Sequence, residues 1–128
     1  MTTHAKTFEA QAGRVPLRLV VMRLGPDAAL VLTGGDRPHV GAVVCAEARP
    51  SLRGEGASAT SSVINRIGHK DEVPARRMAE AVAAATASAV SCTCGIHVDG
   101  AQAADIEAVL RACVELTQRA VEFLVEGR

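Results

Sequence analysis

The hydrophobic residues of this 128-residue chain change their spacing near its midpoint, and this change constrains the fold more than any other feature. Before residue 68 they form short alternating or continuous apolar runs, a pattern typical of strands. After residue 74 they mostly recur every three or four residues, as on one face of a helix. One more short apolar run, at 90–98, interrupts the helical half. The chain is therefore expected to form five strands, a helix, a sixth strand and a last helix.

The strand-like runs are separated by residues that favour turns. Gly13 ends the first run and Gly25–Pro26–Asp27 ends the second, which predicts a hairpin into the third. Such short connections favour antiparallel pairing. The fifth run is the most polar, so we expect it at an edge of the sheet. The expected strands cover residues 6–13, 15–25, 28–35, 39–48, 58–67 and 90–98.

The first expected helix covers the segment "ARRMAEAVAAATASAV", in which Met78, Val82 and Ala85 lie on one face at helical spacing. The acids and the proline in "DEVP", just before it, suit a helix N-terminus, where acids meet the positive end of the dipole.

The last expected helix covers 103–127, and Asp99 is predicted to cap it. Its apolar stripe consists of Ile106, Val109, Leu110, Cys113, Leu116, Ala120, Phe123 and Leu124.

This element order predicts a single α+β domain over residues 1–128. We expect a mostly antiparallel sheet of about six strands with two helices on one face. The other face must also meet an apolar partner, and a second copy of the chain is the simplest candidate, which predicts a homodimer.

Charge and composition exclude several classes of protein. Lys plus Arg and Asp plus Glu both number 14, which gives no net charge for nucleic acid or an anionic membrane to attract. The only aromatic residues are Phe8 and Phe123, too few for base stacking. No run of 18 apolar residues could span a membrane, and the polar start shows no signal peptide, so we expect a cytoplasmic protein.

The four cysteines are Cys45, Cys92, Cys94 and Cys113. A zinc site built from Cys92, Cys94 and a third ligand is one interpretation. Small buried thiols in a reducing compartment are the favoured one.

Polar residues are concentrated in three turns: "TGGDRPHVG" at 33–41, "GHKDE" at 68–72 and "GIHVDG" at 95–100. Each turn combines a glycine with a histidine and an acid, and we expect the three turns to form one site. Glycines there would let the backbone turn and let a ligand approach it. The candidate binding residues are Gly34, Gly35, Asp36, His39, His69, Lys70, Asp71, His97 and Asp99.

The chemistry of these residues suits two kinds of ligand. Lys70 and the free amides of a helix N-terminus favour a phosphate. Imidazoles with carboxylates also suit a divalent metal ion, with His39, His69, His97 and Asp99 as candidate ligands.

Purely structural interpretations of the same residues stay open. Gly34–Gly35–Asp36 could form a simple hairpin turn, and Asp71 and Asp99 could be helix caps. Zinc-protease, dinucleotide, P-loop and nucleophile-elbow motifs are all absent from the sequence, so no catalytic residue is assigned.

Three segments carry a resemblance to a known family: "TGGDRPHVGAVV", "GHKDEVPARRMAEAV" and "CGIHVDGAQAADIEAVL". They resemble the small D-subunit proteins that accompany gallate-type, UbiD-family decarboxylases, which are the prenylated-flavin chaperones. The resemblance extends from about residue 10 to residue 125. It implies a fold similar to proteasome-assembly chaperones, a homodimer, and non-enzymatic binding of reduced prenylated FMN for delivery to a decarboxylase apoenzyme.

The resemblance also implies roles for the candidate residues. Lys70 and the first amides of the helix would hold the phosphate, directly or through a divalent ion. Asp36, His39, His97 and Asp99 would contact that ion or the polar edge of the isoalloxazine. The prenyl ring would lie against Val40 or Ile96.

Two other functions remain open at this point. One is a small metal-dependent enzyme that uses His39, His69, His97 and Asp99. The other is a structural accessory subunit that stabilises a decarboxylase without binding flavin.

Overall fold

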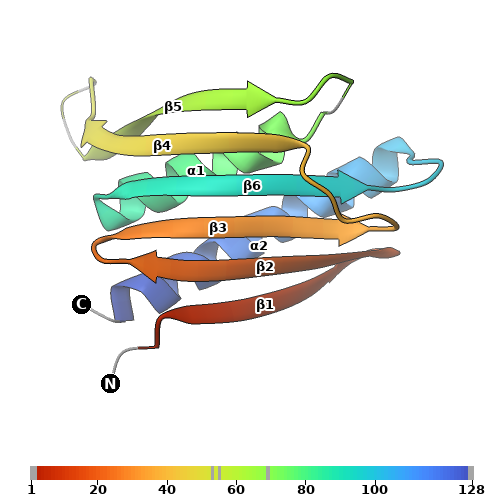
Figure 1. Ribbon diagram of the computed structural model, residues 1–128, viewed down its shortest axis with the longest axis horizontal. Coiled ribbons are helices and arrows are strands. Elements are labelled where there is room, and N and C mark those ends of the chain that lie inside the picture. The colour runs from red at the N-terminus through yellow and green to blue at the C-terminus, as the bar shows by residue number, and fades with distance from the viewer. Residues whose placement is uncertain (1–2, 53, 55, 69, 127–128) are drawn as a thin grey trace.

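The computed structural model describes residues 3–52, 54, 56–68 and 70–126. Two helices cover one face of a six-stranded sheet, which confirms the expected α+β class and the expected element order (Figure 1). The elements are β1 (Ala5–Ala12), β2 (Val15–Leu24), β3 (Asp27–Gly35), β4 (Ala42–Pro50), β5 (Ala57–Asn65), α1 (Glu72–Thr86), β6 (Ala89–His97) and α2 (Ala103–Glu126).

The order of strands in the sheet is β1-β2-β3-β6-β4-β5, so the last strand in sequence lies between β3 and β4. It pairs in parallel with β3 and antiparallel with β4, and every other pairing is antiparallel. The hairpin interpretation of Gly34–Gly35–Asp36 is therefore wrong, because β3 and β4 are not neighbours. Apolar side chains explain the insertion, since Val90, Cys92 and Cys94 of β6 are buried. The polar β5 takes an edge, as expected.

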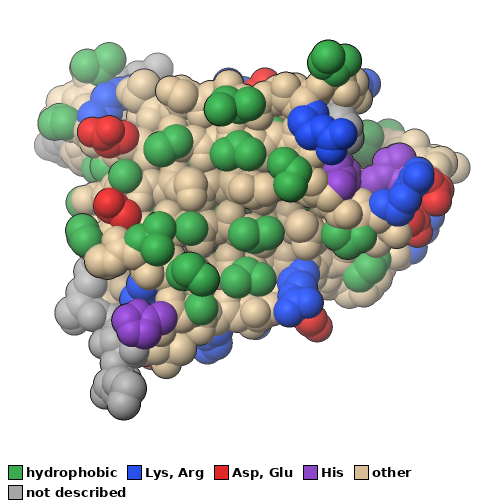
Figure 2. Space-filling view, in the orientation of Figure 1, with side chains coloured by type: hydrophobic (Ala, Val, Ile, Leu, Met, Phe, Trp, Pro, Cys, Tyr) green, Lys and Arg blue, Asp and Glu red, His purple; other side chains and the backbone are tan. Residues whose placement is uncertain are grey.

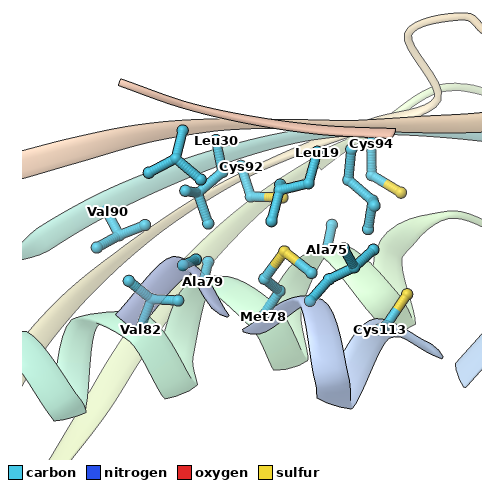
Figure 3. Packing of buried hydrophobic residues seen from close by; sticks show 14 of the residues in the cluster. Leu19, Leu30, Ala75, Met78, Ala79, Val82, Val90, Cys92, Cys94 and Cys113 are labelled. Carbon is cyan, nitrogen blue, oxygen red and sulfur yellow. The ribbon is translucent and has the colours of Figure 1, made fainter. Parts of the chain in front are cut away.

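The core lies between the sheet and the helices, with α1 over β4, β5 and β6 and α2 over β1 and β2. Figure 3 shows Leu19, Leu30 and Cys92 pointing from the sheet toward Met78 and Val82 of α1. Each such buried side chain contributes roughly 1.5–3 kcal/mol relative to leaving it in water. The core contains few aromatic side chains, so the helices must lie close to the sheet to fill the space between them.

Alanines allow that close approach. Ala75, Ala79 and Ala83 on α1 are fully buried against the sheet. Ala85, which the spacing placed on the buried stripe, is exposed instead. The stripe is centred on the face of Ala79 and Ala83, because that is the side the sheet covers.

Both helix starts differ from the predicted capping. Asp71 occupies the N-cap position of α1 but its side chain makes no capping hydrogen bond. Asp99 does not cap α2, which begins four residues later; the Asp105 carboxylate accepts the Gln102 N–H there, at 3.0 Å. Both carboxylates make other contacts: that of Asp71 accepts the Ile96 N–H, and that of Asp99 lies beside Arg37 and His97. No helix in the described part of the chain is long and apolar enough to cross a membrane.

Three of the cysteines are free thiols in the core. Burial raises the pKa of Cys92 to about 12 and that of Cys113 to about 11, and burial also raises the pKa of Cys94. Such thiols stay protonated near neutral pH, which makes them poor metal ligands. Cys45 is exposed on the sheet face that the helices leave uncovered.

Candidate functional site

The three polar turns lie at one end of the sheet, where its strands begin or end. β3 and β6 run in parallel and end there, β5 also ends there, and β4, α1 and α2 all begin there. The connections 36–41 and 98–102 and the described residues 66–68 and 70–71 are therefore neighbours, as the sequence predicted. Figure 2 shows histidine, acidic and basic side chains gathered at this end of the molecule. The sequence therefore predicted the location of the turns, although the path between β3 and β4 was different.

The connection 36–41 crosses over the end of β6 and is tied to it by backbone hydrogen bonds. The Asp36 N–H donates to the His97 carbonyl at 2.6 Å, and the Gly41 N–H donates to the Cys94 carbonyl at 2.9 Å. Gly95 lies directly beneath, and a Cβ built on it would overlap the His39 carbonyl oxygen. Its missing side chain thus makes room for the chain itself.

Gly34 and Gly35 also make room for neighbouring backbone. A Cβ on Gly34 would overlap the Pro16 carbonyl oxygen, and a Cβ on Gly35 would overlap that of His97. Gly35 also has a φ of 76°, which favours glycine. The space that these glycines were expected to leave for a ligand is occupied by neighbouring backbone. They border a separate, shallow hollow of about 600 Å³ between β1, β2 and β3.

Asp71 is the single buried charged residue in the described part of the chain, and it connects three elements. Its carboxylate accepts the Ile96 N–H at 2.9 Å and lies 3.2 Å from Nε2 of His39. The missing side chain of Gly41 provides the space for this carboxylate. Asp71 therefore fixes the start of α1 to β6 and to the 36–41 connection.

His39 is held between two hydrogen-bond acceptors. Its Nδ1 lies 2.9 Å from the Arg37 carbonyl oxygen, and its Nε2 faces the Asp71 carboxylate. Both ring nitrogens are taken up by these contacts, so neither is directed at a metal ion. The ring edge of His39 lines the cavity described below.

An exposed network joins the first and third turns. Nε2 of His97 lies 2.8 Å from the Arg37 guanidinium and 2.9 Å from Oδ1 of Asp99. The hydrogen bond from His97 and the charge of Arg37 lower the pKa of Asp99. The Asp99 N–H donates to the Asp36 carboxylate at 2.8 Å. Arg37 was part of the quoted motif, but spacing alone gave no reason to assign it a contact.

A second ion pair fixes the start of α2. The Arg14 guanidinium, in the β1–β2 turn, donates to both carboxylate oxygens of Asp105 at 3.1 and 3.0 Å. It also donates to the Asp99 carbonyl at 3.1 Å. The hydrogen bond from Arg14 lowers the pKa of Asp105. Sequence reasoning missed both residues, because 91 positions separate them.

A cavity of about 650 Å³ opens between the first turns of the two helices and the end of β6. One part of its wall is polar, from His39, Lys70, Asp71, His97 and Asp105. The larger part is apolar, from Val73, Pro74, Ile96, Val98, Ala101, Ile106, Val109 and Leu110. This size and composition are typical of sites for small-molecule cofactors.

The predicted candidates divide into three groups around this cavity. His39, Lys70, Asp71 and His97 line it, whereas Gly34, Gly35, Asp36 and Asp99 do not. His69 lies outside the described residues. Sequence reasoning missed the apolar wall from α1 and α2, and placed Ile106 in the core stripe of its helix. The position of Ile106 in the first turn of its helix was the signal that could have revealed this wall, because a helix start can extend past the end of the sheet.

The predicted metal ligands do not converge in the described part of the chain. Across residues 3–52, 54, 56–68 and 70–126, no three His, Cys, Asp or Glu side chains form a group that could hold a metal ion. His39 faces Asp71, and His97 faces Asp99 on the rim. The zinc interpretation of Cys92 and Cys94 has no support there for the same reason.

The fold and the cavity together define a small α+β protein in which two helices cover one face of a six-stranded sheet and a cofactor-sized cavity opens at one end. A crystal structure titled as a novel chaperone complex for yeast 20S proteasome assembly has a similar chain, with a TM-score of 0.53. The match covers 93% of this chain and 99% of that one at 14% sequence identity, so it shows the fold alone.

The family is shown by the sequence itself. The model of the prenylated flavin chaperone LpdD-like domain matches residues 11–124, and the chain belongs to this family. Protein LpdD of Lactiplantibacillus plantarum (strain ATCC BAA-793 / NCIMB 8826 / WCFS1) is 27% identical over 120 residues. That match covers 92% of this chain and 84% of the relative. The resemblance inferred from the three motifs is confirmed.

Proposed function

We propose that the 650 Å³ cavity binds reduced prenylated FMN and that the protein delivers it, without catalysing a reaction, to a UbiD-type decarboxylase. One observation carries the proposal: in a chain of the prenylated flavin chaperone family, the cavity combines a polar side, which includes Lys70, with a long apolar wall. FMN has the same division, with a charged phosphate and polar ring edge on one side and a flat ring system on the other.

Lys70 and the first turn of α1 would hold the phosphate. Lys70 is exposed and lines the cavity next to the helix start, where free amides and the helix dipole favour an anion. His97 lies on the same side and would contact the phosphate or the polar edge of the ring, whereas His39, whose ring nitrogens face Arg37 and Asp71, would shape that side of the cavity. The prenylated flavin would supply its own chemistry only after transfer.

An oxygen-free titration with reduced prenylated FMN tests the binding site. We expect tight binding for the wild-type chain and a roughly tenfold loss for Lys70→Ala, the usual size of one charge-assisted contact. Arg111→Ala is the matched control, because Arg111 is exposed on α2 and does not line the cavity. Equal binding by all three proteins would contradict the proposed site.

Delivery is tested separately with a purified gallate-type apo-decarboxylase. We expect the flavin-loaded protein to restore decarboxylase activity faster than the same concentration of free reduced prenylated FMN. The flavin recovered from the chaperone alone should be chemically unchanged, since the proposed role is non-enzymatic. No advantage over free flavin would contradict the delivery role while leaving binding intact.

The uncovered face of the sheet supports the proposed homodimer. One row of registered residues crosses it, and the row carries no charge: Val20, Val31, Thr93, Val43 and Ile64. Figure 2 shows hydrophobic side chains spread over this face. Two copies could bury this central row against each other without desolvating a charge within it. A divalent ion and a cytoplasmic location remain predictions from the sequence.

A further inference from the structure

The apolar wall of the cavity contains side chains whose exposure is unusual for their position. Ile106 belongs to the apolar stripe of α2 by its spacing, yet it is 56% exposed. Val73, in the first turn of α1, is 38% exposed. Both helices begin past the end of the core, so these side chains face the cavity instead of the sheet.

The wall continues inward along α2. Leu110 lies one helical turn after Ile106 and is partly buried, and Val109 beside it is 8% exposed. Asp105 is the polar residue of α2 that also lines the cavity, and its carboxylate is already bound by Arg14 and by the Gln102 N–H. The α2 side of the cavity therefore offers a ligand mainly hydrocarbon.

Plain and prenylated FMN share their phosphate, their ribityl chain and the polar edge of the ring. They differ by an added ring built from an isoprenoid hydrocarbon. Polar contacts from Lys70 and His97 are available to both forms, so these residues cannot account for discrimination between them. A preference for the prenylated form requires an apolar contact that only the added ring can reach.

We propose that Ile106 and Leu110 on α2 form this contact and set the preference of the protein for prenylated over unmodified flavin. The inference rests on the proposed function, because it concerns the same cavity. It replaces the sequence-based expectation that Val40 contacts the prenyl ring, since Val40 does not line the cavity. Ile96 does line it, but it directly precedes His97 in β6 and its N–H is bound by Asp71, so it belongs to the polar side of the cavity, where the groups shared by both flavins would lie.

The test compares two ligands on four proteins without oxygen. Reduced prenylated FMN and reduced FMN are titrated into the wild-type chain, Ile106→Ala, Leu110→Ala and Val114→Ala. Val114 is the matched control, because it lies one turn after Leu110, is 62% exposed and does not line the cavity. Thermal unfolding of each variant checks the fold, and of the two wall substitutions Ile106→Ala is the less able to disturb it, because Ile106 is 56% exposed.

We expect Ile106→Ala and Leu110→Ala to weaken the binding of prenylated FMN by about tenfold, the usual value of a few buried methylene groups. Their binding of plain FMN should change less than about twofold, so the ratio of the two dissociation constants falls. Val114→Ala should leave this ratio unchanged.

Other outcomes overturn the inference in distinguishable ways. An unchanged ratio in both wall variants, with wild-type binding intact, rejects the role of α2 and leaves the proposed function standing. If Val114→Ala lowers the ratio of the two dissociation constants as much as the wall variants do, the effect belongs to α2 in general. That outcome also rejects the inference. Failure of the wild-type chain to bind either flavin rejects the proposed function and this inference together.

Discussion

Asp71 is the residue on which the geometry of the cavity depends most. Its buried carboxylate accepts the Ile96 N–H and faces His39, so removing it leaves a partly buried donor without its acceptor. We expect Asp71→Ala to lower the free energy of unfolding by about 2–4 kcal/mol. Asp71→Asn should cost less, because its carbonyl oxygen still accepts the Ile96 N–H. Urea unfolding measures both.

Glu107→Ala is the matched control for this prediction, since Glu107 is exposed on α2. It should change the free energy of unfolding by less than about 0.5 kcal/mol. Asp71→Ala with a stability equal to that of the control would mean that the carboxylate is not a structural tie.

Gly95 is a second single-residue determinant of the site. A side chain there would collide with the backbone of His39, which cannot move without breaking the hydrogen bonds of the 36–41 connection. We expect Gly95→Ala to lower the free energy of unfolding by about 3 kcal/mol or more. Gly25 has open space around it, so an alanine there would meet only an unfavourable positive φ. We expect Gly25→Ala to lower the free energy of unfolding by about 1 kcal/mol. Equal losses in thermal stability for the two variants would contradict this account.

At the scale of elements, the Arg14–Asp105 pair fixes α2 against the β1–β2 turn. Arg14 lowers the pKa of Asp105 in the folded state, so the pair stabilises the fold above the ordinary carboxyl pKa of about 3.9. This contribution is lost as the pH falls through the lower pKa of the folded state. Arg14→Gln should therefore be less stable than the wild type at pH 6, and the difference should shrink toward pH 2.

Urea unfolding midpoints across that pH range measure the effect. Arg111→Gln, on the exposed surface of the same helix, is the control and should show no such narrowing. A difference between Arg14→Gln and the wild type that stays constant down to pH 2 would assign the loss to packing of the arginine stem instead of to the ion pair.

The elements themselves could largely be predicted from the sequence, because each is encoded by the local spacing of apolar residues. The existence of all six strands and both helices followed from that spacing, and β5 was correctly placed at an edge. The insertion of β6 between β3 and β4 could not be predicted, since pairing depends on contacts between residues about 60 positions apart, such as Leu30 with Cys92. The 36–41 connection is as short as a hairpin loop. Its length therefore favoured pairing of β3 with β4, which β6 separates in the sheet.

The candidate site was predictable only in part for the same reason. The glycine, histidine and acid clusters marked the turns, and the turns do meet. The apolar wall formed by Ile106 and Leu110 carries an ordinary helical pattern, which does not reveal whether a helix turn faces a sheet or a cavity. Arg14 and Asp105 form an ion pair only because the fold brings the β1–β2 turn beside α2.

At the scale of the whole molecule, the fold leaves one sheet face without helices, and its centre is apolar and uncharged. Val31 lies in the row of registered residues there and is 40% exposed. In a dimer formed through this face, Val31→Asp would bury a carboxylate without a partner, which is strongly unfavourable. We expect the variant to lose at least about 100-fold in dimer affinity, or about 2.7 kcal/mol.

Sedimentation over a range of protein concentrations measures that loss directly. Val125→Asp provides the control, because Val125 has a similar exposure of 42% but lies near the end of α2, on the helical side of the molecule. The wild type and the control should sediment as dimers under conditions in which Val31→Asp is a monomer with an unchanged fold. The cavity opens on the helical side of the sheet edge, so the monomeric variant should still bind reduced prenylated FMN. A Val31→Asp variant that remains dimeric would place the interface elsewhere, and loss of flavin binding on dissociation would mean that the second copy completes the site.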